Sequence, residues 1–298
     1  MTAARMPDHT ADLGLLLAAE ALFPPGGIGV WLMLPLVGFA AGALGGALGI
    51  GGGLIIIPVL LLTQPDLFGV GSLHVYKLAA LITTVVVSVP AAIRHRRARV
   101  LTPALLRKAV PAAFVCAIAG VLLGGLFGGP QTRHLQRIFG VFILLVVASN
   151  VLLGRLTVPN TARQHVPESG SRPARWWHGV LVGGPAGIIG GLLGVGGGVW
   201  AVPLQYLGLR MPLRTAIANS AMLIVFVGLA SVPAQAWTVW RMPELSAAAG
   251  VGLAVWIAPG AVLGGWIGAA LTHRLPLEWL RAGFHVLLAA SGLRLLIG

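Results

Sequence analysis

Charged side chains, and carboxylates above all, are scarce in this sequence. Its 298 residues include only 7 Asp and Glu against 20 Lys and Arg, and charged residues make up 9% of the chain. An ordinary soluble domain has about 25%. So low a fraction excludes an ordinary soluble globular domain.

Several catalytic and structural features are also missing. The single cysteine, Cys116, excludes an internal disulfide. No phosphate-binding loop of the form G-x-x-x-x-G-K-S/T occurs, and the eight histidines form no pair at metal-ligand spacing. The sequence therefore predicts neither an ATP-driven pump nor a metalloenzyme, and we expect no enzymatic activity and no cofactor.

What the sequence has instead is a large apolar content. Hydrophobic residues make up 57% of the chain, and the mean hydropathy is +0.92. A hydrocarbon core of about 30 Å needs about 20 apolar residues per helix, which leaves room for about eight to ten membrane segments. The composition predicts an all-α polytopic membrane protein.

The net charge of +13 is spread between apolar segments and forms no single patch, so we expect no nucleic acid as a partner. Half of the basic residues lie in two connections, which the positive-inside rule assigns to the cytoplasm. This pattern predicts a multi-pass protein of a bacterial-type inner (plasma) membrane. The two groups are Arg94, Arg96, Arg97, Arg99, Arg107 and Lys108, and then Arg155, Arg163, Arg172 and Arg175.

A glycine-rich segment that ends in proline occurs twice. The first copy, GALGGALGIGGGLIIIP, runs from Gly42 to Pro58, and the second, GIIGGLLGVGGGVWAVP, runs from Gly187 to Pro203. Nine of the seventeen positions are identical. Each triple glycine removes the side chains that favour a continuous helix, so each copy is predicted to be two spans, one broken span or a re-entrant hairpin.

The similarity between the two halves extends beyond the glycines, because Ser88-Val89-Pro90-Ala91 recurs as Ser231-Val232-Pro233-Ala234. We therefore expect two homologous repeats of about four to five membrane segments each. The polar, proline-containing stretch between them is typical of a linker. The predicted parts are an N-terminal lead-in (1–30), a first membrane repeat (31–154), a cytoplasmic linker (155–175) and a second membrane repeat (176–298).

Parallel and inverted repeats place nearly equal numbers of basic residues in the cytoplasm, so charge does not choose between them. We favour inversion, because opposed broken helices at the membrane midplane form a site that two halves share in transporters.

The paired motifs resemble those of the sulfite exporter TauE/SafE family of membrane permeases. The resemblance covers nearly the whole chain after about residue 30. It is carried by the segments 45–58 and 190–203, each a glycine run followed by a proline about five residues later. It implies transport of sulfur-containing anions such as sulfite, sulfoacetate and related organosulfonates.

The two triple glycines are the predicted anion site. A helix that restarts after a glycine run offers free backbone N–H groups and a partial positive charge of about half an elementary unit, which suits a sulfonate or carboxylate oxygen. Glycine also lets an anion approach the backbone closely. The residues expected to bind are Gly51, Gly52, Gly53 and Leu54 in the first half and Gly196, Gly197, Gly198 and Val199 in the second.

Side chains in the next helices complete the predicted site. Family members commonly carry a Thr-Ser pair there; this chain has Asn219-Ser220 in the second half and Tyr76-Lys77 in the first. A lysine inside a membrane segment is by default functional, although it can also snorkel to an interface. We expect Lys77, Asn219 and Ser220 to be the main contacts, with Tyr76 and Gln205 as further members.

The function predicted from these features is a secondary permease, more easily an exporter because the membrane potential drives anions outward. Its partners would be a small anionic organosulfur substrate and the lipid bilayer. The alternative is a membrane-embedded assembly or scaffolding protein, whose glycines only allow close packing. The sequence leaves open the anion, the direction, the coupling ion and whether the protein forms a homo-oligomer.

Overall fold

The computed structural model describes residues 27–48, 51–64, 67–69, 71–156, 176–271 and 277–297, and every regular element in these ranges is helical. The predicted all-α membrane fold is therefore confirmed. Seven of the described helices are long and apolar enough to cross a membrane. The helices are α2 (Ile28–Leu48), α3 (Gly53–Thr63), α4 (Ser72–Arg97), α5 (Pro103–Gly125), α6 (Thr132–Leu156), α7 (Trp176–Leu193), α8 (Gly198–Pro203), α9 (Leu213–Trp240), α10 (Ala247–Leu271) and α11 (Leu277–Ile297).

The predicted N-terminal lead-in and most of the predicted linker lie outside the described residues. Helix α2 already begins at Ile28, inside the stretch assigned to the lead-in. Helix α6 ends at Leu156 and α7 begins at Trp176, close to the expected edges of the linker.

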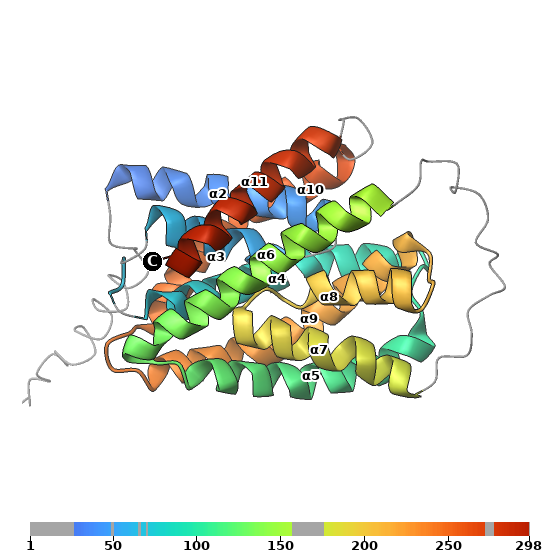
Figure 1. Ribbon diagram of the computed structural model, residues 1–298, viewed down its shortest axis with the longest axis horizontal. Helices are drawn as coiled ribbons and strands as arrows, with labels where there is room; N and C mark the ends of the chain where they lie inside the picture. Colours follow the sequence, from blue (N-terminus) through green and yellow to red (C-terminus); the bar gives the residue numbers. More distant parts are fainter. Residues whose placement is uncertain are drawn as a thin grey trace, which may run out of the picture.

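Each glycine run forms the turn of a hairpin that does not cross the bilayer twice. In Figure 1, α2 enters the bundle and α3 returns toward the end from which α2 came, while α8 returns in the same way after α7. Helix α3 has 11 residues, a length of about 16 Å at 1.5 Å per residue, against about 30 Å for the hydrocarbon core. Of the three predicted alternatives, the structure agrees best with the hairpin, in which a long helix is followed by a short return helix.

The two hairpins enter from opposite ends of the bundle (Figure 1). Three full-length helices, α4, α5 and α6, separate the first hairpin from the second. An odd number of crossings reverses direction, so α2 and α7 run oppositely. We call the end at which α4 ends and α5 begins the basic end, because the Arg94 to Lys108 connection lies there.

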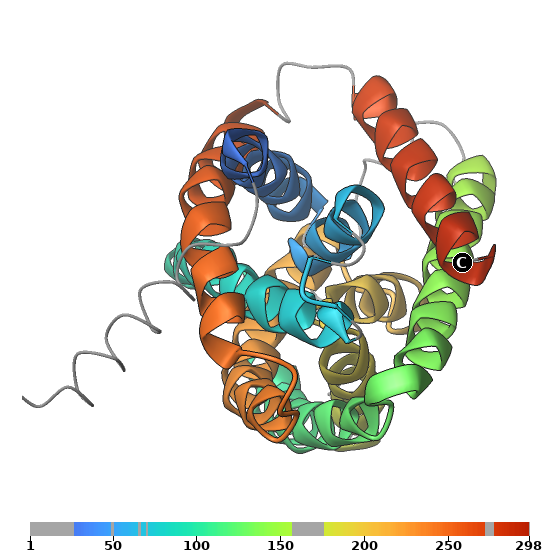
Figure 2. The ribbon, with the colours of Figure 1, turned by 90° about the vertical axis from the view of Figure 1, so that its left-hand side faces the viewer.

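The main helix contacts join a helix of the first half of the chain to a helix of the second half. Helix α2 packs on α10 and α7 on α5, while α4 contacts α9 and α6 contacts α11 (Figure 2). Backbones touch at the first two contacts: a Cβ added at Gly42 would lie 1.9 Å from the carbonyl oxygen of Ala261, and one at Gly191 would lie 2.1 Å from that of Ala117. Small residues allow this close approach between membrane helices.

Candidate functional site

The two glycine turns meet at the centre of the bundle. A Cβ added at Gly53 would lie 2.4 Å from the carbonyl oxygen of Gly194, and one at Gly51 would lie 3.3 Å from that of Val195. Gly51, Gly194, Gly196 and Gly197 all have positive φ angles, between 76° and 88°. We call this contact of residues 51–53 with residues 194–197 the glycine crossing.

Only glycine fits most of the crossing, for two reasons. Positive φ strains any residue with a Cβ, and the neighbouring backbone leaves no room for one at Gly53. The predicted residues Gly51, Gly52, Gly53 and Leu54, and also Gly196, Gly197 and Gly198, are all buried here. Val199 follows in α8 and is half-buried.

Thr84 of α4 closes one side of the crossing. Its Oγ1 accepts a hydrogen bond of 3.1 Å from the backbone N–H of Gly53, which satisfies one of the free donors at the start of α3. Its methyl group lies 3.2 Å and 2.9 Å from the positions that Cβ atoms would take on Gly51 and Gly196. Sequence reasoning did not place Thr84 among the residues expected to bind.

Lys77 lies beside the crossing, on the same helix. Its side chain is completely buried, so its ammonium group does not snorkel to an interface. Its Cβ and Cγ lie against Gly194, and its Nζ lies 2.8 Å from the position of a Cβ on Gly124. Among the described residues, Nζ has no hydrogen-bond partner.

Tyr76 points away from the crossing, toward the far end of α3. Its hydroxyl donates to the backbone carbonyl of Gln64, and its ring stands edge-to-face against Phe68, with 6.1 Å between centroids. These contacts fix the end of α3 rather than offer a group to a substrate at the crossing.

Asn219 and Gln205 also hydrogen-bond to the protein. The Asn219 amide donates to Gln205 Oε1 at 3.0 Å, and its Oδ1 accepts from the backbone N–H of Thr102 at 2.9 Å. Gln205 in turn donates to the Ala201 carbonyl at 3.0 Å. Asn219 thus ties the residue before α5 to the π-helical turn after α8 (Leu204–Gly208).

The structure does not bring Lys77 and Asn219 together. Lys77 contacts Gly124, near the end of α5, whereas Asn219 bonds to Thr102, just before its start. Twenty-two residues of helix separate these two positions by about 33 Å. In this structure one small anion therefore cannot contact Lys77 and Asn219 together. Ser220, next to Asn219, is buried in the same region of α9.

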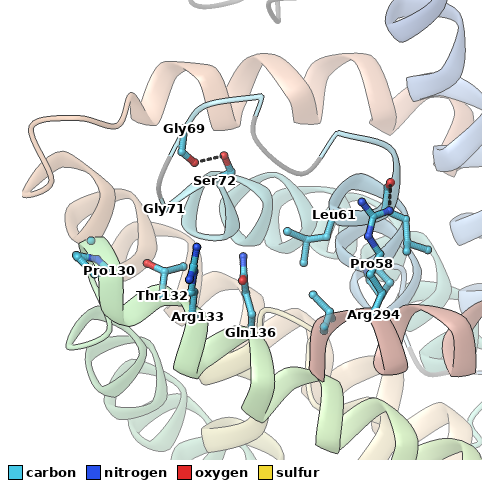
Figure 3. Close-up of a pocket in the computed structure, with 13 residues that line it drawn as sticks. Pro58, Leu61, Gly69, Gly71, Ser72, Pro130, Thr132, Arg133, Gln136 and Arg294 are labelled. Atoms are coloured by element: carbon cyan, nitrogen blue, oxygen red, sulfur yellow. Dashed lines mark hydrogen bonds between the residues drawn. The ribbon is translucent and has the colours of Figure 1, made fainter. Parts of the chain in front are cut away.

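Arginines line cavities at both ends of the bundle. A cavity of about 660 Å³ opens between α3, the start of α4, α6 and α11, and its lining includes Arg133, Gln136 and Arg294 (Figure 3). Another of about 720 Å³ at the basic end is lined by Arg96, Arg99 and Arg107. Sequence reasoning missed the first cavity, because its two arginines are 161 positions apart in the chain.

Comparison with known proteins agrees with this architecture. Residues 34–295 match the family model of the sulfite exporter TauE/SafE. The chain belongs to the TauE/SafE family. No solved structure matches it.

Several relatives of this TauE/SafE protein are named probable membrane transporter proteins. MamO of Magnetospirillum gryphiswaldense is 28% identical over 89% of this chain, which spans only 44% of MamO. YunE of Bacillus subtilis is 24% identical and a Haemophilus influenzae relative 27% identical, each over 89% of this chain and nearly its own full length (97% and 98%). Together with the seven apolar helices described above, these matches make the chain a multi-pass protein of the plasma membrane.

Proposed function

We propose that this TauE/SafE permease is a secondary transporter that moves a sulfur-containing anion, such as sulfite, sulfoacetate or another organosulfonate, by alternating access. The observation that carries the proposal is the glycine crossing, where two opposed re-entrant hairpins meet at the centre of the bundle. Hairpins of this kind, entering from opposite ends, are the elements around which transporters rock to expose a central site alternately to the two sides.

Charge supports an anionic substrate. Helix α3 begins at the crossing, where its partial positive charge favours an anion, and the buried ammonium of Lys77 lies alongside. The arginine-lined cavities at the two ends raise the local concentration of anions on both sides. An inside-negative potential is worth about 2.3 kcal/mol per charge per 100 mV, so export is the direction that the potential favours.

The test is binding and flux measured with the purified protein. Sulfite, sulfate, thiosulfate, sulfoacetate and taurine are compared with carboxylates of matched size, first by thermal stabilisation, because a ligand that binds only the folded state raises the melting temperature. Efflux from vesicles under an imposed potential then gives the direction. A saturable shift and a potential-driven efflux for one sulfur-containing anion are expected.

The scaffolding alternative gives a different result. A protein whose glycines only allow close packing shows no saturable shift for any anion of the panel and no flux. A saturable response to carboxylates alone would keep the permease but exclude sulfur-containing anions as its substrates.

A further inference from the structure

We propose that His74, Lys77, Ser231 and Gln235, on α4 and α9, bind the head group of a singly charged oxyanion that carries its own proton, such as hydrogensulfite. This inference rests on the proposed function, because it places the substrate at one side of the glycine crossing. Neither the glycine motif nor the matched residues of the other half predict such a site.

The first argument is the placement of unsatisfied polar atoms. In the part of the chain that the structure describes, four buried side-chain atoms lack a hydrogen-bond partner, and each belongs to one of these residues. All four side chains are completely buried. Unpartnered buried polar atoms are rare in proteins and costly. The four atoms are His74 Nδ1, Lys77 Nζ, Ser231 Oγ and Gln235 Oε1.

The second argument is that the four residues lie together. Helices α4 and α9 pack side by side and run in opposite directions, and Gln235 donates to the backbone carbonyl of His74 at 3.0 Å. Lys77 is one turn after His74, and Ser231 is one turn before Gln235. In an antiparallel pair, one turn forward on α4 and one turn back on α9 lead in the same direction. Lys77 and Ser231 therefore lie at neighbouring heights, one helical turn deeper in the bundle than the contact between Gln235 and His74.

The third argument is the chemistry of the free atoms. The Lys77 ammonium and the Ser231 hydroxyl can donate to oxyanion oxygens. The Nε2 of His74 lies 3.1 Å from the carbonyl oxygen of Phe127; a carbonyl only accepts, so Nε2 holds the proton and a neutral ring leaves Nδ1 as an acceptor. Together with Gln235 Oε1 it can receive the O–H of the anion, and the single cation matches a single negative charge.

A cavity at the end opposite the basic end is linked to the cluster through the Phe127 carbonyl. The carbonyl of Phe127 that contacts His74 also accepts a hydrogen bond from Thr132 at 3.0 Å. Thr132 and Ser72 line the 660 Å³ cavity with Arg133 and Arg294 (Figure 3). Arg294 donates to the Leu62 carbonyl at 2.7 Å, and no ion pair of either arginine with a described carboxylate is found. Asp66 lies outside the described residues.

The other half of the chain offers matched controls. Aligning the two Ser-Val-Pro-Ala segments places Ile217, Ser220, Ser88 and Ala92 opposite His74, Lys77, Ser231 and Gln235. None of the four matched residues carries a charge. The proposed site is therefore present in one half only, and Ser88→Ala is the natural control for Ser231→Ala.

The experiment uses selenite, whose monoanion has the charge and shape of hydrogensulfite and whose selenium is located by anomalous scattering from crystals of the full chain. Selenium within hydrogen-bond reach of Lys77 Nζ and Ser231 Oγ is the expected result. By titration calorimetry, Lys77→Met should weaken sulfite and selenite binding by at least about tenfold, as for a lost charge-assisted hydrogen bond. Ser231→Ala should weaken it several-fold, and Ser88→Ala should leave it unchanged.

Selenium found only elsewhere, or not at all, overturns the inference, as does unchanged affinity in both Lys77→Met and Ser231→Ala. Should Lys77→Met fail to fold, the selenium position and the Ser231→Ala and Ser88→Ala pair decide. Failure of the proposed function looks different: selenite occupies the cluster but vesicles show no sulfite flux. If flux persists in Lys77→Met, the protein is a permease, but the four-residue cluster is not the substrate site of its transport.

Discussion

At the scale of single residues, Lys77 is the group whose placement most needs an explanation. A charge that is fully buried and without a partner is destabilising unless something compensates it, and in a membrane segment it is a mark of function. Replacing Lys77 should therefore raise the stability of the fold while it weakens anion binding. Replacing a lysine with a purely structural role would lower the stability.

We predict that Lys77→Met raises the melting temperature of the purified, ligand-free protein. Replacing an uncompensated buried ammonium by an apolar chain of similar length should stabilise the fold by about 1–4 kcal/mol. Differential scanning fluorimetry in detergent measures the shift. Arg137→Met, at an exposed position, is the control and should change little. A lower melting temperature for Lys77→Met would indicate that the lysine holds neighbouring carbonyls and is structural.

Gly52 and Gly53, which are neighbours in the turn of the first hairpin, should respond differently to substitution by alanine. Gly52 has φ of −74°, and a Cβ there would meet only ordinary contacts of 3.5 Å or more. A Cβ at Gly53 would lie 2.4 Å from a backbone oxygen of the other hairpin. Gly53→Ala must therefore push the two turns apart, whereas Gly52→Ala fits.

We therefore expect Gly52→Ala to keep anion flux near the wild-type rate and Gly53→Ala to reduce it by at least about tenfold, since a shift of about 1 Å in a binding site can cost far more. Flux in vesicles, corrected for the amount of inserted protein, measures both. Equal flux in the two variants would show that contact between the turns is not needed for transport.

At the scale of elements, the return helix α3 depends on α4 through one hydrogen bond. The Gly53 N–H at the start of α3 has Thr84 Oγ1 as its acceptor, and a backbone N–H without an acceptor is costly inside an apolar bundle. The adjacent Thr83 instead donates to Ala79, within its own helix. Thr84 thus bonds to another helix, whereas Thr83 bonds only within its own helix.

Thr84→Val should destabilise the protein by about 1–3 kcal/mol, the cost of leaving a buried backbone donor without an acceptor. Thr83→Val removes only a bond to its own helix and should cost clearly less. Thermal unfolding of the two variants provides the comparison. Equal melting temperatures would mean that the start of α3 finds another acceptor.

At the scale of the whole molecule, the opposed hairpins and the distribution of arginines predict which end of the bundle faces the cytoplasm. The basic end carries the Arg94 to Lys108 connection, and the positive-inside rule places it in the cytoplasm. The cavity lined by Arg133 and Arg294 then faces outward, where it would be the exit of the exporter that we propose.

A labelling experiment tests this orientation. In a Cys116→Ser background, we expect Ala98→Cys to be protected from a membrane-impermeant thiol reagent in intact cells, and Gln131→Cys to react. Both positions are exposed and lie at opposite ends of the bundle. Reaction of Ala98→Cys in intact cells would reverse the orientation, and equal reactivity of both would contradict the arrangement of the helices.

The sequence alone determined the class of the protein, because so apolar and weakly charged a chain can fold stably only inside a bilayer, as helices. It also marked the two glycine turns, since a triple glycine in an apolar segment has no use in a continuous helix. It gave no means to choose between a hairpin, a broken span and two spans, because all three satisfy the same local pattern.

Only the tertiary structure decided which polar groups share a site. The pair Tyr76-Lys77 aligns with Asn219-Ser220 in the other half, so alignment suggested a common ligand, but antiparallel packing of α4 and α9 places Lys77 and Asn219 at opposite ends of α5. The same packing brings Gln235 against the backbone carbonyl of His74 and places Lys77 and Ser231 at neighbouring heights on their helices. Which residues meet across two helices depends on their direction and register, and neither is encoded in the local sequence of one helix.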